Sequence, residues 1–142
     1  MRVEPYLYFD GNCREAVEFY AKVFRSEVTN LMAYSDVPAS PDFPIAEADR
    51  DRVMYAGVPM GEVTMMASDV PSGSPFTVGT NITLAVALPT ADEVTRVVAE
   101  LAADGGTVVM EPQKTFFAEW YGQSTDRFGI TWQILVWTPE AA

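Results

Sequence analysis

Apolar residues recur at helical spacing in two segments of the chain. In each segment a polar residue that can cap a helix is followed three residues later by Glu, at Asn12 with Glu15 and at Thr90 with Glu93. This pairing is a capping box, which marks the start of a helix. The apolar stripes that follow are Ala16, Phe19, Tyr20, Val23 and Phe24 in the first segment, and Val94, Val97, Val98, Leu101 and Ala102 in the second. The pattern predicts two amphipathic helices, the second ended by Gly105 and Gly106 in left-handed conformation.

The two helical segments belong to a longer repeat. An apolar run precedes each helix, at 5–9 and at 82–88, and Thr29 and Met32 after the first helix recur as Thr107 and Met110 after the second. Two further apolar segments complete each half, at 52–58 and 62–67 and at 115–121 and 130–137. We therefore predict one domain of the α+β class with two β-α-β-β-β modules, 1–68 and 81–142, joined by a Ser/Pro/Gly-rich linker at 69–80.

Some of the predicted strands, at 5–9 and 130–137, are apolar at almost every position. A strand with one face in water should alternate apolar and polar residues, so both faces of these strands should be covered. The helices cover one face, and a partner module or a ligand-sized cavity should cover the other. The segment 35–50, rich in Pro and acidic residues, is typical of a lid or binding loop or of a passive surface excursion.

The charge of the chain limits its partners. The 142 residues carry 20 acidic and 9 basic side chains, a net charge of −11. Nucleic acids and anionic membranes are bound by clustered Lys and Arg, so neither is expected as a partner. The chain has no long apolar run and a single cysteine, so we expect a cytoplasmic protein without an internal disulfide. It has no histidine, which excludes serine-type catalytic triads, His-based zinc sites and imidazole acid–base chemistry.

Short motifs along nearly the whole chain resemble a known family. They are Pro5-Tyr6-Leu7, Phe9-Asp10-Gly11-Asn12-Cys13, Ala67-Ser68-Asp69, Pro71-Ser72-Gly73, Thr115-Phe116, and Thr125-Asp126-Arg127-Phe128-Gly129-Ile130 followed by Trp132. With the paired modules, they resemble the vicinal oxygen chelate superfamily, which includes glyoxalase I, ring-cleaving dioxygenases and bleomycin-resistance proteins. The motifs look closest to its PhnB-like branch. The resemblance implies that the modules form a curved mixed-sheet cup, as in glyoxalase/bleomycin-resistance proteins, and that the chain forms a homodimer.

Metal-dependent members of this superfamily place one ligand, typically His or Glu, on each of four strands. The residues that correspond to these ligands here are Pro5, Met65, Asn81 or Thr83, and Gln133. None of them is a strong ligand for a divalent ion, so the resemblance implies no metal and no cofactor. A site made only of carboxylates would need Glu62, Glu119 and a third acid. The branch is sometimes described as a demethylubiquinone methyltransferase, but the Gly-rich turn of a doubly wound methyltransferase does not occur in this sequence.

Alternation along the strands identifies residues that would line the cup on the face turned away from the helices. It places Gln133 on one face with Thr131 and Leu135, and Glu119 on one face with Phe117. Glu119 is the only acid within the aromatic segment 115–121. It is either a carboxylate with a raised pKa that binds a cation or acts as a base, or an outward-facing residue in water.

We predict a ligand-binding role for eight residues, with core packing as the alternative for the tyrosines: Tyr6, Tyr8, Tyr55, Met65, Phe117, Glu119, Trp132 and Gln133. No residue is assigned a catalytic role. Cys13, at the expected start of the first helix, is either a reactive thiol or a small buried apolar residue.

The sequence thus indicates a PhnB-like protein of the glyoxalase fold that has lost the usual metal ligands. We expect it to bind a small apolar, aromatic or cationic molecule. The alternative is an enzyme of the same fold, either a metal-dependent lyase or dioxygenase or a metal-free isomerase with Glu119 as the base. A purely structural dimer with a filled cup is a third possibility.

Overall fold

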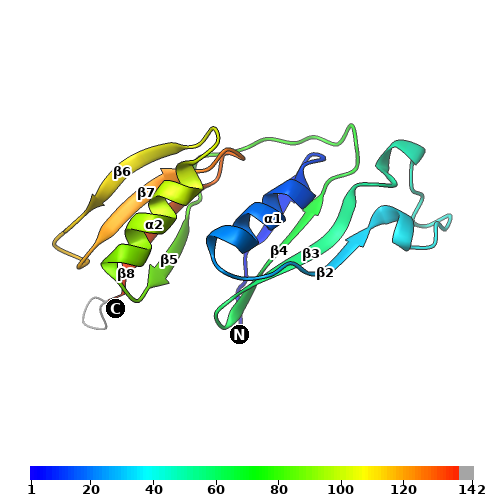
Figure 1. The fold of residues 1–142 in the computed structure, drawn as a ribbon. Helices are drawn as coiled ribbons and strands as arrows, with labels where there is room; N and C mark the ends of the chain where they lie inside the picture. Colours follow the sequence, from blue (N-terminus) through cyan, green and yellow to red (C-terminus); the bar gives the residue numbers. More distant parts are fainter. Residues whose placement is uncertain (138–142) are drawn as a thin grey trace. The chain divides into compact units, whose positions relative to one another are not determined.

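The computed structural model describes residues 1–137, which fold as two compact units, one spanning Met1–Phe76 and one beginning at Thr77. Within the described residues, each unit has four strands and one α-helix in the order strand, helix, strand, strand, strand (Figure 1). The predicted α+β class and β-α-β-β-β modules are therefore confirmed. The end of the second predicted module, 138–142, lies outside the described residues.

The first unit has a four-stranded mixed sheet in the order β1-β4-β3-β2, with β1 parallel to β4 and the other neighbours antiparallel. Its elements are β1 (Tyr6–Phe9), α1 (Cys13–Val23), β2 (Thr29–Ala33), the short 3-10 helices η1 (Tyr34–Asp36) and η2 (Glu47–Asp49), β3 (Val53–Met60) and β4 (Val63–Asp69). The segment 35–50 thus contains η2 and most of η1.

The second unit repeats this topology with the strand order β5-β8-β7-β6, and β5 runs parallel to β8. Its elements are β5 (Leu84–Leu88), α2 (Ala91–Ala102), β6 (Thr107–Gln113), β7 (Tyr121–Thr125) and β8 (Thr131–Val136).

Each helix packs on one face of the sheet of its own unit, with most of its apolar stripe buried and Phe19, Phe24 and Ala102 half-buried. Four residues of α2 are fully or almost fully buried: Val94, Val97, Val98 and Leu101. Burial of one such side chain stabilises the fold by about 1.5–3 kcal/mol. We call the opposite side of each sheet its helix-free face. Neither helix in the described range 1–137 is long and apolar enough to cross a membrane.

The strand predicted at 115–121 is wrong. Residues 114–120 form turns and bends instead, and β7 begins only at Tyr121. The Thr115 hydroxyl accepts a hydrogen bond from the Ala118 N–H (3.1 Å), and the Thr115 N–H donates to the Ala118 carbonyl (3.2 Å). A side-chain hydroxyl that satisfies a nearby backbone N–H favours such a turn over a strand.

The true strand, β7, was missed because the positions that it buries under α2, Gly122 and Ser124, are small rather than large and apolar. The Ser124 hydroxyl donates to the Val98 carbonyl of α2 (2.7 Å). A Cβ atom added to Gly122 would lie only 2.7 Å from Val98 Cγ2. Because α2 lies so close to β7, large apolar side chains do not fit at these positions, and hydrophobicity does not mark the strand.

The N-termini of the two helices are capped in different ways. Thr90 caps α2 as predicted, because its Oγ1 accepts from the Glu93 N–H (3.2 Å) and its hydroxyl donates to the Glu93 carboxylate (3.1 Å). The side chain of Asn12 makes no capping bond, so the capping box predicted there is wrong. Asp69 Oδ1 instead accepts from the N–H groups of Gly11 (2.8 Å) and Cys13 (3.0 Å).

The left-handed residues after α2 also differ from the prediction by one position. They are Asp104 (φ 57°) and Gly105 (φ 112°), rather than Gly105 and Gly106. The helix therefore ends, as predicted, in a left-handed turn, but the first left-handed residue is Asp104 and not a glycine.

The different caps lead to a test. We expect Thr90→Ala to lower the free energy of unfolding by about 1 kcal/mol, since it removes the acceptor for the Glu93 N–H. Asn12→Ala should change it by less than about 0.5 kcal/mol, because Asp69 performs the capping. Urea denaturation followed by circular dichroism measures both variants. Equal losses would contradict the assignment of the caps.

Candidate functional site

The helix-free face of the second sheet brings together several of the predicted ligand-binding positions. Along β8, Trp132, Ile134 and Val136 are buried under α2, while Thr131, Gln133 and Leu135 are half-buried on the other side. The predicted face of Gln133 is therefore confirmed. In the sheet register Gln133 lies between Ala85 of β5 and Gln123 of β7.

Gln133 is part of a continuous chain of hydrogen bonds on this face. Gln123 Nε2 donates to the Tyr121 hydroxyl (2.6 Å), which in turn donates to Gln133 Oε1 (2.7 Å). Gln133 Nε2 then donates to Thr83 Oγ1 (2.7 Å). We call these four residues the amide–hydroxyl chain. It joins Gln133, the fourth metal-ligand position by the family resemblance, to Thr83, one of the two alternatives for the third position.

Aromatic and aliphatic side chains flank the amide–hydroxyl chain. The Phe117 ring lies edge-on to the Tyr121 ring, with centroids 4.9 Å apart, and is 41% exposed. The Phe116 ring in turn lies edge-on to the Phe117 ring, with centroids 5.1 Å apart. Leu135 is the register partner of Tyr121. The site therefore combines a short polar row with apolar surface, which is typical of sites for small organic molecules.

The strands β5, β7 and β8 carry no charged side chain on this face, whereas β6, the neighbour of β7, carries the exposed Glu111. On β5, β7 and β8, the positions of the helix-free face hold Ala85, Ala87, Tyr121, Gln123, Thr125, Thr131, Gln133 and Leu135. None of these residues is Asp, Glu, Lys or Arg. The second polar contact on this face, between the hydroxyls of Thr125 and Thr131 (2.7 Å), is also neutral.

Of the two surroundings considered for Glu119, the structure has the outward-facing one. Glu119 lies exposed in the irregular segment 114–120, because the strand that would have placed it among buried aromatic residues is absent. The structure therefore gives no support to Glu119 as the base of an isomerase.

Trp132 and Met65 lie on the helix-covered sides of their sheets. Trp132 is 1% exposed, and its indole N–H donates to Asp126 Oδ2 (2.9 Å). Met65 is fully buried and pairs in register with Val58 beneath α1. Neither side chain is placed to touch a ligand on a helix-free face, because adjacent strand residues point to opposite sides. Met66, next to Met65, holds the position on the helix-free face of the first sheet.

The three predicted tyrosines share the helix-free face of the first sheet. Tyr6 and Tyr8 project from the edge strand β1 with ring centroids 5.4 Å apart, and Tyr8 is 62% exposed. Tyr55 of β3 lies two residues from Gly57, the register partner of Met66. Its hydroxyl lies 3.4 Å from where a Cβ on Gly57 would be, so Gly57 leaves room for the ring.

The described residues do not fit the metal of the metal-dependent relatives. Within 1–137, no group of three or more His, Cys, Asp or Glu side chains is arranged to hold an ion. The helix-free faces offer amides, hydroxyls and a thioether, and these neutral groups bind divalent ions weakly.

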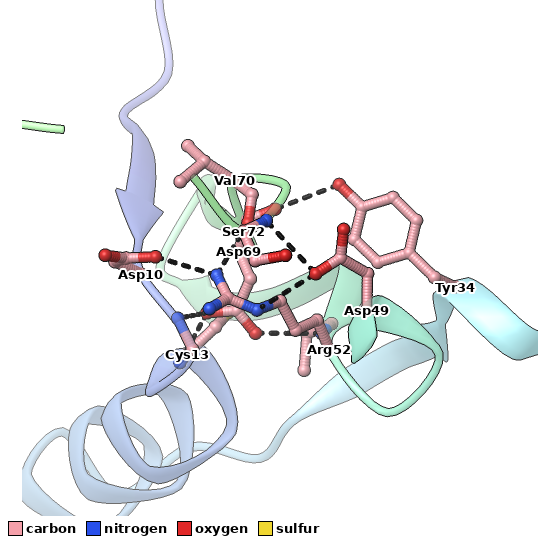
Figure 2. A network of polar contacts seen from close by, with 10 residues as sticks. Asp10, Cys13, Tyr34, Asp49, Arg52, Asp69, Val70 and Ser72 are labelled. Carbon is pink, nitrogen blue, oxygen red and sulfur yellow. Dashed lines mark hydrogen bonds and ion pairs between the residues drawn. The ribbon is translucent and has the colours of Figure 1, made fainter. Parts of the chain in front are cut away.

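A polar cluster in the first unit, drawn in Figure 2, is centred on Asp69, a residue that the sequence did not single out. Asp69, at the end of β4, is 2% exposed. Its Oδ1 holds the N-terminus of α1, and its Oδ2 accepts from the Val53 N–H at the start of β3 (2.9 Å). The Tyr34 hydroxyl donates to its backbone carbonyl (3.0 Å).

Arg52 extends this cluster toward the surface. It donates to Asp10 Oδ1 and to the Val70 carbonyl, both at 2.8 Å, and its Nε lies 3.5 Å from Asp49 Oδ1. Asp49 also accepts from the Ser72 N–H (3.1 Å). Hydrogen bonding from Ser72 lowers the pKa of Asp49, and hydrogen bonding to Asp10 raises the pKa of Arg52. The cluster joins four segments of one unit, so we interpret it as structural.

Cys13 lies against this cluster and is a small buried apolar residue, not a reactive thiol. Its side chain is completely buried. Burial, with the charge of Asp69 as a second cause, raises the pKa of the Cys13 thiol to about 12. The thiolate, which is the reactive form, is therefore negligible at neutral pH.

Comparison with known proteins identifies the family. Residues 1–135 match the family model described as 3-demethylubiquinone-9 3-methyltransferase. The chain therefore belongs to this family. It is 32% identical to protein YjdN of Escherichia coli K12, over 96% of this chain and 95% of that protein.

Solved structures share the fold of this chain. Protein PA1353 from Pseudomonas aeruginosa has a TM-score of 0.84 and 30% identity, covering 96% of this chain and 97% of that one. A putative 3-demethylubiquinone-9 3-methyltransferase, the PhnB protein from Bacillus cereus, shares the fold with a TM-score of 0.75 and 24% identity, over 96% and 100% of the chains. A glyoxalase/bleomycin resistance protein/dioxygenase family enzyme from Burkholderia phytofirmans shares it with a TM-score of 0.60 and 15% identity, over 91% and 92%.

The family description names a methyltransferase, but the described fold differs from that of a doubly wound methyltransferase. Such an enzyme has a mostly parallel sheet with a Gly-rich turn after its first strand. Both sheets of the described chain are four-stranded and mixed, with one parallel pair each. The family is thus shown without that activity being shown for this chain.

Replacing Asp69 tests its structural role. In Asp69→Asn, the amide NH₂ group cannot accept a hydrogen bond, so at least one buried N–H group loses its partner. We expect the free energy of unfolding to fall by about 2 kcal/mol in urea denaturation. Asp10→Asn, at the half-exposed end of the cluster, should lower the free energy of unfolding by less than about 1 kcal/mol. A loss in Asp69→Asn no larger than in Asp10→Asn would show that Asp69 does not organise the unit.

Thiol titration tests the state of Cys13. At about pH 8 a disulfide reagent such as DTNB should modify the folded protein only as fast as it unfolds, because the buried thiol stays protonated. The same protein in urea should react completely within the mixing time. Rapid stoichiometric modification of the folded protein would instead show an accessible, activated thiol.

Proposed function

We propose that this protein binds a small apolar, aromatic or cationic organic molecule on the helix-free face of the second sheet, without a metal ion. The observation that carries this proposal is the amide–hydroxyl chain beside Phe117. Four neutral polar side chains form an ordered row next to exposed aromatic surface. Pockets for small molecules combine apolar contact area with a few fixed polar groups in this way.

The two kinds of side chain have different tasks in the proposed complex. Covering Phe117 and Leu135 would remove apolar surface from water, at about 25 cal/mol per Å². The amides of Gln123 and Gln133 would set the orientation of the ligand, because the Tyr121 hydroxyl between them fixes both. The net charge of −11 disfavours anionic ligands during approach.

Three further expectations accompany the proposal. Tyr6, Tyr8 and Tyr55 present aromatic surface on the first sheet and are proposed as additional ligand contacts there. The homodimer implied by the family resemblance and the cytoplasmic location are also predictions. Sedimentation analysis of the purified protein measures the first, and cell fractionation measures the second.

Fragment screening by NMR tests the binding proposal. Ligands should shift the side-chain amide signals of Gln123 and Gln133, and Tyr121→Phe should weaken their binding about fivefold, the effect of one lost hydrogen bond. Thr125→Val is the control, since it removes a hydroxyl on the same face that lies outside the amide–hydroxyl chain. An equal loss in Thr125→Val, or no effect of Tyr121→Phe, would contradict the assignment of ligand binding to this chain.

A further inference from the structure

The chain contains the dipeptide Asp-Gly twice, at Asp10-Gly11 and at Asp104-Gly105. This dipeptide has a chemistry of its own, because glycine has no Cβ that would hinder access to its backbone nitrogen. That nitrogen can attack the side-chain carboxyl carbon of the preceding aspartate and close a five-membered ring. Both pairs are exposed, so exposure alone does not distinguish them.

Hydrogen bonds hold both reacting groups of the first pair. The Asp10 carboxylate accepts from Arg52 Nη1 (2.8 Å; Figure 2), and the Gly11 N–H donates to Asp69 Oδ1 (2.8 Å). The Arg52 side chain also lies against Gly11, since a Cβ added to Gly11 would be 3.4 Å from Arg52 Nη2. The ring can close at this pair only after these bonds open, because the Gly11 nitrogen must turn from Asp69 toward Asp10.

The second pair lies in the left-handed turn after α2 and is not held in this way. Within residues 1–137, neither the Asp104 carboxylate nor the Gly105 N–H forms a hydrogen bond or an ion pair. After α1, a bond from the Ser26 N–H to the Ala21 carbonyl (2.8 Å) closes the corresponding turn. The two reacting groups of the second pair can therefore approach each other by rotation within an exposed turn.

We propose that Asp104 is a site of spontaneous isomerisation to isoaspartate in the folded protein, and that the fold protects Asp10 from the same reaction. The Gly105 nitrogen forms a bond to Cγ of Asp104 and loses its proton, and the carboxyl group loses its hydroxyl, so one water molecule leaves and a succinimide ring remains. One water molecule then adds to either ring carbonyl. Addition at the original backbone carbonyl breaks its bond to nitrogen and gives isoaspartate, with the chain running through Cβ. Addition at Cγ restores aspartate.

Prolonged incubation of the purified protein at neutral pH tests the proposal. One sample stays folded and another is unfolded in guanidinium chloride, so that each aspartate has its own unprotected reference. Trypsin separates the two sites, because Asp10 lies in the peptide 3–14 and Asp104 in the peptide 97–114. A protein isoaspartyl methyltransferase with labelled S-adenosylmethionine then measures the isoaspartate in each peptide.

The two sites should respond differently to folding. Asp104 should isomerise in the folded protein at close to its rate in the unfolded chain. Asp10 should isomerise at least about tenfold more slowly in the folded protein than in the unfolded chain, because the reaction must wait for hydrogen bonds to two charged side chains to open. Equal slowing of both sites by folding, or faster reaction at Asp10 than at Asp104, would overturn the proposal.

Two matched variants establish the origin of the signal. Asp104→Glu keeps the charge but would have to close a six-membered ring, which forms much more slowly, so it should remove most of the isoaspartate that the folded protein accumulates. Asp10→Glu makes the same change at the protected pair and should leave that amount unchanged. An undiminished signal in folded Asp104→Glu would assign the isoaspartate to another residue and contradict the inference.

Discussion

The first unit depends on one buried carboxylate. Asp69 accepts hydrogen bonds from backbone N–H groups in two separate segments and thereby fixes the N-terminus of α1 against the start of β3. Its negative charge lies where the dipole of α1 stabilises an anion. The second unit has a counterpart in Asp126, which accepts from the Phe128 and Ile130 N–H groups and from the Trp132 indole. In both units, then, a buried aspartate compensates for backbone groups that the sheet and helix leave unpaired.

Local patterns in the sequence were sufficient to predict much of the fold, and tertiary constraints explain the rest. The apolar stripes of both helices and the Thr90 cap depend on residues within a few positions of one another, so they can be recognised without a structure. The cap of α1 comes from a residue 56 positions away from Cys13, and no local pattern marks it. β7 escaped prediction because the closeness of α2 requires Gly122 and Ser124 where a buried strand usually has large apolar side chains.

The same reasoning explains which parts of the candidate site were found. Strict alternation placed Gln133 on the helix-free face, and the same rule buries its neighbour Trp132 under α2. Tyr121 and Gln123 were missed as a polar row because the strand carrying them was placed too early in the chain. Because β7 begins at Tyr121, the amides of Gln123 and Gln133 and the Tyr121 hydroxyl lie side by side and form hydrogen bonds. Glu119 precedes the strand and is exposed.

The unequal caps of the two helices have a consequence for how the chain acquires its structure. α2 carries the acceptor for its first turn in the residue just before it, so it can begin as soon as that short segment exists. α1 requires a strand end that leaves the ribosome much later, and such distant contacts form at a greater entropic cost. We therefore expect the half of the protein that is synthesised first to be completed only when β4 has joined its sheet, while the half that follows can start its helix on its own.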